Sequence, residues 1–161
     1  MRARLLLTAL LLTGLLTGCG EGPHIEGSLT PLLNLRYDKS EAVADANEAS
    51  VRFFTQQEEG ENTILKVTAR LDSLEFKPGQ EVNLAELLGK AEDSPQRGSV
   101  SRSVLKEPER DFPRIFIGGL TFDKAPDPGA TVPGSFHVTF VNGTHVYSGR
   151  TLFGRFEATV P

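Results

Sequence analysis

The chain has 161 residues, a length that suits one domain of ordinary size. Its hydrophobic fraction of 39% is too high for a disordered chain and too low for a multi-span membrane protein. The formal net charge is −4, which argues against a nucleic-acid partner, because phosphates require clustered Lys and Arg side chains. The single cysteine, Cys19, excludes an internal disulfide bond and any metal cage of several cysteines.

The N-terminus has the pattern of an export signal. Arg2 and Arg4 precede a run of twelve mostly apolar residues, 5–16. As a helix this run would extend about 18 Å, which is short of the roughly 30 Å hydrocarbon core of a bilayer. The pattern therefore predicts a signal peptide over residues 1–18 and no permanent transmembrane helix.

A specific motif ends this run, in the order Leu16, Thr17, Gly18 and Cys19. It resembles the lipobox of bacterial lipoproteins, in which an aliphatic residue and two small residues precede a cysteine. The resemblance covers residues 1–19. It implies that signal peptidase II cuts between Gly18 and Cys19, and that the Cys19 thiol then carries acyl chains such as palmitate. An ordinary secretory signal that happens to end in a cysteine is the alternative.

The residues after the motif bear on where the protein is held. Two or more acyl chains anchor a protein stably, so we expect membrane attachment through Cys19. Gly20 stands where many inner-membrane lipoproteins have aspartate, and by resemblance to that sorting rule the outer membrane is favoured over the inner. Residues 19–27 are rich in glycine and are expected to form a flexible tether, with the folded domain over residues 28–161.

The sequence pattern predicts strands in the first half of the domain. We expect a first strand over 32–37 and further strands over 50–56 and 64–71, separated by a solvated turn at 57–61. The strand at 64–71 alternates most clearly, with Leu65, Val67, Ala69 and Leu71 on one side. The polar, alanine-rich segment 38–49 gives no clear assignment.

The middle of the domain is less regular. Asn83 and Glu86 have the spacing of a helix cap and a first-turn acid, which predicts one short helix over 84–90. A weaker strand is expected over 97–105 and another over 113–123. In the latter, a bulge at Gly118 and Gly119 would place four apolar side chains on one face, namely Ile115, Ile117, Leu120 and Phe122.

The C-terminal third predicts a three-stranded meander. Asn142 and Gly143 form a strong hairpin signal, and a two-residue turn there would pair Phe140 with His145. A second turn at residues 149–150 would then lead to a last strand with Phe156, Ala158 and Val160 on the same face. Strands without alternating long helices predict an all-β fold: a single antiparallel β-sandwich, or a small barrel, with at most one short helix.

The search for catalytic residues gives little. The sequence lacks the motifs of serine hydrolases, zinc proteases, phosphate-binding loops and dinucleotide-binding folds, so we do not expect an enzyme. In the predicted register His137 and His145 lie on opposite faces, and His24 lies in the tether, so no metal site is expected. The acidic tip at residues 58–61 is expected to be a solvated turn, and no cofactor is expected.

The same register predicts a contact surface on the reverse of the meander. It places Val146 beside Phe153, with Val141 diagonal to them, as an apolar patch with a polar rim. Coverage of this patch by another segment, such as 38–49, is the alternative.

The function expected from these features is non-catalytic. We expect binding or scaffolding at the bacterial envelope, with an envelope protein as partner. A subunit of a motility, secretion or adhesion complex, an enzyme with an unrecognised site, and a small-ligand or lipid carrier are the alternatives.

Overall fold

The computed structural model describes residues 22–161, which form nine β-strands and no helix. The strands are β1 His24–Glu26, β2 Lys39–Ala44, β3 Glu48–Gln57, β4 Gly60–Arg70, β5 Val82–Asn83, β6 Gly98–Ser103, β7 Ile115–Phe122, β8 Thr131–Phe140 and β9 Thr151–Thr159.

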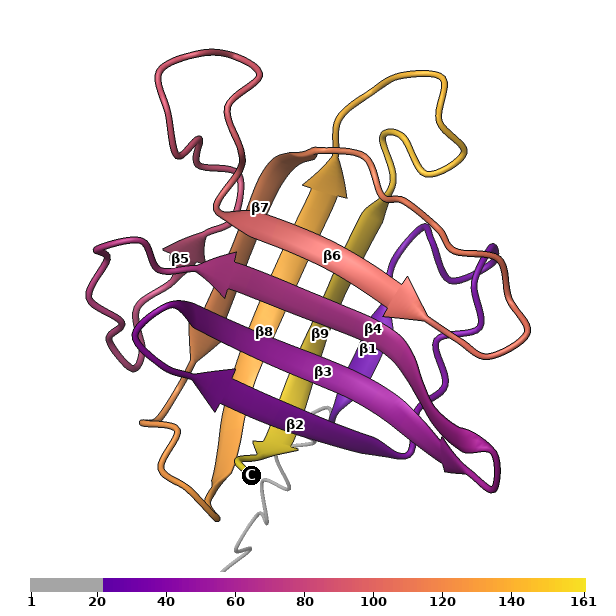
Figure 1. Ribbon diagram of the computed structural model, residues 1–161, viewed down its shortest axis with the longest axis vertical. Helices are drawn as coiled ribbons and strands as arrows, with labels where there is room; N and C mark the ends of the chain where they lie inside the picture. The colour runs from indigo at the N-terminus through magenta and orange to yellow at the C-terminus, as the bar shows by residue number, and fades with distance from the viewer. Residues whose placement is uncertain (1–21) are drawn as a thin grey trace, which may run out of the picture.

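These strands form two layers. Their order is β5-β7-β8-β9-β2-β3-β4-β6, with β1 added beside β9. Figure 1 shows β2, β3, β4 and β6 in front of β7, β8 and β9, with the two sets crossing steeply. The layers are joined where Glu41 in β2 pairs with Thr159 in β9, which is a parallel contact in an otherwise antiparallel arrangement. The predicted all-β sandwich is therefore confirmed, as one mixed sheet that is not closed into a barrel.

Aromatic side chains fill the space between the layers. Phe53 of β3 lies 5.7 Å from Phe136 of β8 and 6.3 Å from Phe156 of β9, measured between ring centroids. Phe122 of β7 packs on Phe156 at 5.7 Å. All four side chains are buried, so the hydrophobic core lies between the β2-β3-β4-β6 layer and the β7-β8-β9 layer.

Several predicted elements of the first half are confirmed. β3 and β4 pair through a turn at residues 58–59, and the predicted face of β4 is buried. The segment 38–49 supplies β2 and the start of β3, and its alanines are explained by burial, since Ala42 and Ala49 have no exposed surface.

Two predictions at the N-terminal side are wrong. Residues 32–37 form no strand: the N–H of Leu33 donates to the carbonyl of Leu29 in a turn, and Leu33 and Leu35 are buried without strand pairing. The flexible tether is wrong for residues 24–26, because these form β1 and pair with Phe153, Gly154 and Arg155 of β9.

The predicted helix over 84–90 is also absent. Asn83 does accept a hydrogen bond from the N–H of Ala85, at 3.0 Å, as a cap would. However, the N–H of Leu84 donates to Gly118 and the carbonyl of Leu84 accepts from Gly98. These bonds tie the Leu84 backbone to the middle of β7 and the start of β6, so it cannot take part in the i to i−4 ladder of a helix.

The bulge in β7 lies elsewhere than predicted. The pairing with β8 shifts between Ile115 and Ile117, while Gly118 and Gly119 are in regular register. Ile115 is therefore buried, but Ile117 is 53% exposed on the opposite face. A side chain at Gly119 would displace the exposed, flexible side chain of Glu81.

The predicted meander is wrong in its middle strand. β8 pairs directly with β9, with Val138 opposite Leu152 and Phe136 opposite Gly154, and residues 141–150 form a loop. Burial of Tyr147 favours the loop, because its ring stacks on Phe112, with the ring centroids 5.2 Å apart, and does not face a strand partner. The apolar face of the last strand is nevertheless buried as predicted.

Candidate functional site

The anchor residues Leu16, Thr17, Gly18 and Cys19 lie outside the described residues. Their distance from the domain is limited by the chain itself. Five residue steps separate Cys19 from His24, the first residue of β1, and this allows a span of at most about 18 Å. The side of the domain that carries β1 therefore lies within reach of any acyl group on Cys19.

The three residues of the predicted contact patch occupy two places. Val141 and Val146 lie in the loop between β8 and β9, and Phe153 lies on β9. Val146 is 61% exposed and Phe153 is 41% exposed, whereas Val141 is half-buried. The strand pairing that would make Phe153 a neighbour of Val146 does not exist, so the patch must be redrawn around Phe153.

Strand pairing defines the neighbours of Phe153. His137 of β8 lies opposite it on one side, and Glu26 of β1 lies opposite it on the other. In the next row, Thr139 of β8 pairs with both Ile117 and Thr151. Since alternate residues of a strand face the same side, all of these side chains share the outer face of the β1-β9-β8-β7 layer.

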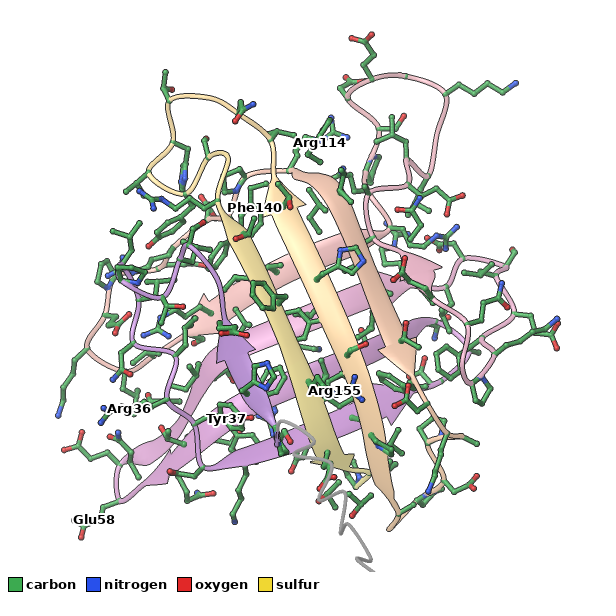
Figure 2. All side chains as sticks on the ribbon, turned by 180° about the vertical axis from the view of Figure 1, so that it is seen from behind. Arg36, Tyr37, Glu58, Arg114, Phe140 and Arg155 are labelled. Carbon is green, nitrogen blue, oxygen red and sulfur yellow. The ribbon has the colours of Figure 1, made fainter. Side chains whose placement is uncertain are left out.

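We call this surface the outer face. It is defined by Ile117, His137, Thr139, Thr151 and Phe153. Figure 2 shows this side of the layer, and no other strand or loop of residues 22–161 crosses in front of β7, β8 and β9. Ile117 is the member that sequence reasoning missed, because it was expected in the core; only the position of the bulge reveals it.

Polar side-chain pairs surround the apolar centre of the outer face. The Nε2 atom of His137 lies 3.1 Å from the Glu81 carboxylate, and a guanidinium nitrogen of Arg155 lies 3.7 Å from Asp123. His24 and Glu26 form a third pair on β1, at 3.3 Å. An exposed apolar centre with a polar, accessible rim is typical of protein contact surfaces.

A second group of ionisable residues, around the buried side chain of Arg102, is structural. The guanidinium of Arg102 donates two hydrogen bonds to the Glu107 carboxylate, at 2.8 and 3.1 Å. It also donates to the carbonyls of Asn34 and Ile64. Hydrogen bonding to Arg102 holds the pKa of Glu107 below its usual value. These polar groups bind one another, so they are committed to holding the fold.

The histidines are separated from one another. His24 lies on β1, His137 on β8 and His145 in the loop 141–150. His145 is exposed and lies beside the Tyr147 ring, at 5.3 Å, so its expected place opposite Phe140 is wrong. Within residues 22–161, no three His, Cys, Asp or Glu side chains come together in a way that could hold a metal ion.

A surface hollow of about 580 Å³ lies between β2 and the end of β9, lined in part by Tyr37, Ser40 and Glu41. Burial raises the pKa of Tyr37. The Ser40 hydroxyl donates to the backbone carbonyl of Glu157, and Glu41 pairs with Arg52 at 2.6 Å. The Ser40 and Glu41 side chains are thus engaged within the protein.

The described part of the chain is therefore an all-β sandwich with an uncovered outer face. The chain matches no family model, no curated protein and no solved structure. Among residues 22–161, no helix is long and apolar enough to cross a membrane.

Proposed function

We propose that this protein is a bacterial envelope lipoprotein whose β-sandwich binds or scaffolds another envelope protein, without catalysis. Acyl chains on Cys19 would hold it, with the outer membrane favoured over the inner. The motif Leu16-Thr17-Gly18-Cys19 at the end of a short apolar run supports the anchor.

The outer face is the observation that carries the binding role. Exposed Phe153 and Ile117 lie on one sheet face, with threonines between them and polar side-chain pairs around them. β1, the strand that follows the anchor most closely, belongs to the same layer. A partner held at the same membrane would therefore meet this face without a long linker.

The anchor is tested by mass spectrometry of the mature protein. The expected N-terminus is Cys19 with acyl chains attached, and Cys19→Ser should leave an uncut or unlipidated product. An unmodified N-terminus at any other residue would contradict the anchor and leave the outer face to be tested separately.

The outer face is tested by crosslinking in native membranes. Phe153→Ala should reduce recovery of the crosslinked partner, while the free energy of unfolding stays within about 0.5 kcal/mol, because the side chain is exposed. Val43→Ala is the matched control, since Val43 is an exposed apolar residue of β2 in the other layer, at 37%. Equal recovery from the two variants would exclude the outer face as the contact surface.

A further inference from the structure

The edge strand β6 has backbone groups that no other strand uses. On its inner side the N–H of Arg70 in β4 donates to Arg97, at 2.8 Å, and on its outer side the N–H of Gly98 donates to Leu84. Because backbone groups alternate along an antiparallel strand, those of Val100 and Arg102 point outward, as Gly98 does. Within residues 22–161 these outward groups have no hydrogen-bond partner.

The opposite edge of the sheet is covered, which makes β6 distinct. β5 pairs with β7 at Gly119 and Leu120. The side-chain amide of Gln96 donates to the carbonyl of Ile115 and accepts from its N–H, at 2.7 and 2.8 Å. β6, in contrast, carries only serines on its solvent side and has no lysine or proline to block pairing.

A groove runs along the open edge of β6. The connection from β6 to β7 turns back past this edge, as Figure 1 shows, without pairing with it. A hollow of about 400 Å³ lies between Val100 and Phe112, and a second hollow of about 320 Å³ lies between Arg102 and Glu109. Each hollow is lined in part by residues of β6, and we call the open edge together with these two hollows the β6 groove.

We propose that the β6 groove binds an extended segment of a partner protein as an added strand. The outward N–H and C=O groups of Val100 and Arg102 would form the new ladder, two residues apart. An apolar side chain of the segment would enter the hollow at Val100 and Phe112. A basic side chain two positions away would enter the hollow at Glu109.

The lining of the two hollows supports this choice of segment. The first hollow has an apolar wall of Val100, Phe112, Pro113 and Ile115 and a polar wall that includes Asp93, Gln96 and Ser99. Its one arginine, Arg114, donates to the carbonyls of Glu92 and Ser94. In the second hollow Arg102 pairs with Glu107, at 2.8 Å, and Arg110, which does not line the hollow, also pairs with Glu107, at 3.6 Å. Glu109 forms no ion pair within the described residues, so it favours a cation.

The test uses the full-length protein in detergent micelles and the synthetic peptides acetyl-TLTKT-amide and acetyl-TKTLT-amide, which cover both strand directions. One of them should bind and protect the amide hydrogens of Val100 and Arg102 from exchange, as read by NMR. Replacing its lysine with glutamate should weaken binding at least tenfold, and Glu109→Gln should remove most of this preference.

Val100→Pro is the decisive variant, because it removes an outward N–H while leaving the pairing with β4 intact. It should weaken peptide binding at least tenfold while the β4–β6 pairing persists, as read from the protection of the Ser99 and Ser101 amide hydrogens. Ser101→Thr, on the solvent side of the same strand, is the matched control and should bind normally. Glu109→Gln provides a second test if Val100→Pro fails to fold.

Three results would overturn the proposal: protection on another strand, equal binding of the lysine and glutamate peptides, or concentration-dependent protection of β6 without peptide. The last result would mean that a second copy of the chain occupies the edge. None of these results bears on the outer face, because Phe153 lies on a different layer.

Discussion

Two buried arginines hold the region where β6 meets β4. Arg97 donates to the carbonyls of Arg70 and Leu71, at 2.7 and 2.9 Å. Arg102 donates to Ile64 and to the Glu107 carboxylate. A guanidinium has five N–H donors, so each arginine satisfies several acceptors that would otherwise be buried without partners. The two charged side chains therefore stabilise the fold.

Arg102→Ala should therefore be strongly destabilising. It removes a buried guanidinium that donates to the carbonyls of Asn34 and Ile64, and leaving a buried acceptor without a partner costs about 1–3 kcal/mol for each group. Urea unfolding monitored by circular dichroism measures the change. Arg155→Ala is the control: Arg155 is exposed and lies 3.7 Å from Asp123, and its loss should cost less than about 1 kcal/mol. Equal costs for the two variants would contradict the structural role of Arg102.

The same pair predicts a dependence of stability on pH. The pKa of Glu107 in the folded state lies below its usual value of 4.5, so its stabilising contribution is present above that pH. It is lost as the pH falls through the folded-state pKa. Glu107→Gln should lower the urea midpoint at pH 7, and the difference from the unaltered protein should shrink at pH 3. A constant difference at both pH values would show that Glu107 is not the titrating group.

At the scale of elements, two cross-strand Phe–Gly pairs fix how β8 and β9 align. Phe136 lies opposite Gly154, and Phe156 lies opposite Gly134. A Cβ atom at position 154 would lie 2.8 Å from the Phe136 ring, which is too close for any side chain. Each large ring therefore takes the space left by the glycine across from it, and this fixes the register of the two strands.

Gly154→Ala should disturb this register. Inserting a methyl group into a packed core costs about 1–3 kcal/mol, and thermal unfolding provides the measurement. Gly22→Ala is the control, because a Cβ atom there would meet nothing within 4 Å. A Gly154→Ala variant as stable as Gly22→Ala would refute the packing argument.

At the scale of the whole molecule, β1 ties the start of the chain to the domain. It pairs with β9 over three residues and places partly buried Ile25 against the core. A chain that begins at Ser28 should therefore be less stable than one that begins at Gly22, by about 2 kcal/mol from lost hydrogen bonds and apolar burial. Urea midpoints of the two chains decide this. Equal midpoints would mean that β1 contributes nothing to the fold.

The local sequence pattern predicted strands correctly where consecutive strands pair with each other through a short turn. The strands at 50–56 and 64–71 and the turn between them follow from period-two alternation and a polar tip. The exposed position of Phe153 also followed from alternation, because the parity of β9 does not depend on which strand lies beside it.

Pairing partners could not be read from the sequence. The Asn142-Gly143 signal suggested a tight hairpin, but burial of Tyr147 under Phe112 favoured a loop over residues 141–150. Leu84 had a helical context, yet its backbone bonds to Gly118 and Gly98 outweighed that local preference. In both cases contacts between segments distant in the sequence decided the outcome.

The sequence by itself determined the all-β class, the buried faces of β4 and β9 and the expectation of a lipid anchor at Cys19, because these depend on local composition and spacing. The tertiary structure alone decided that Ile117 joins Phe153 on the outer face and that the edge of β6 stays open beside two hollows. The physical reason is the same for both: a one-residue bulge and an unpaired edge are properties of strand pairing, which distant segments settle together.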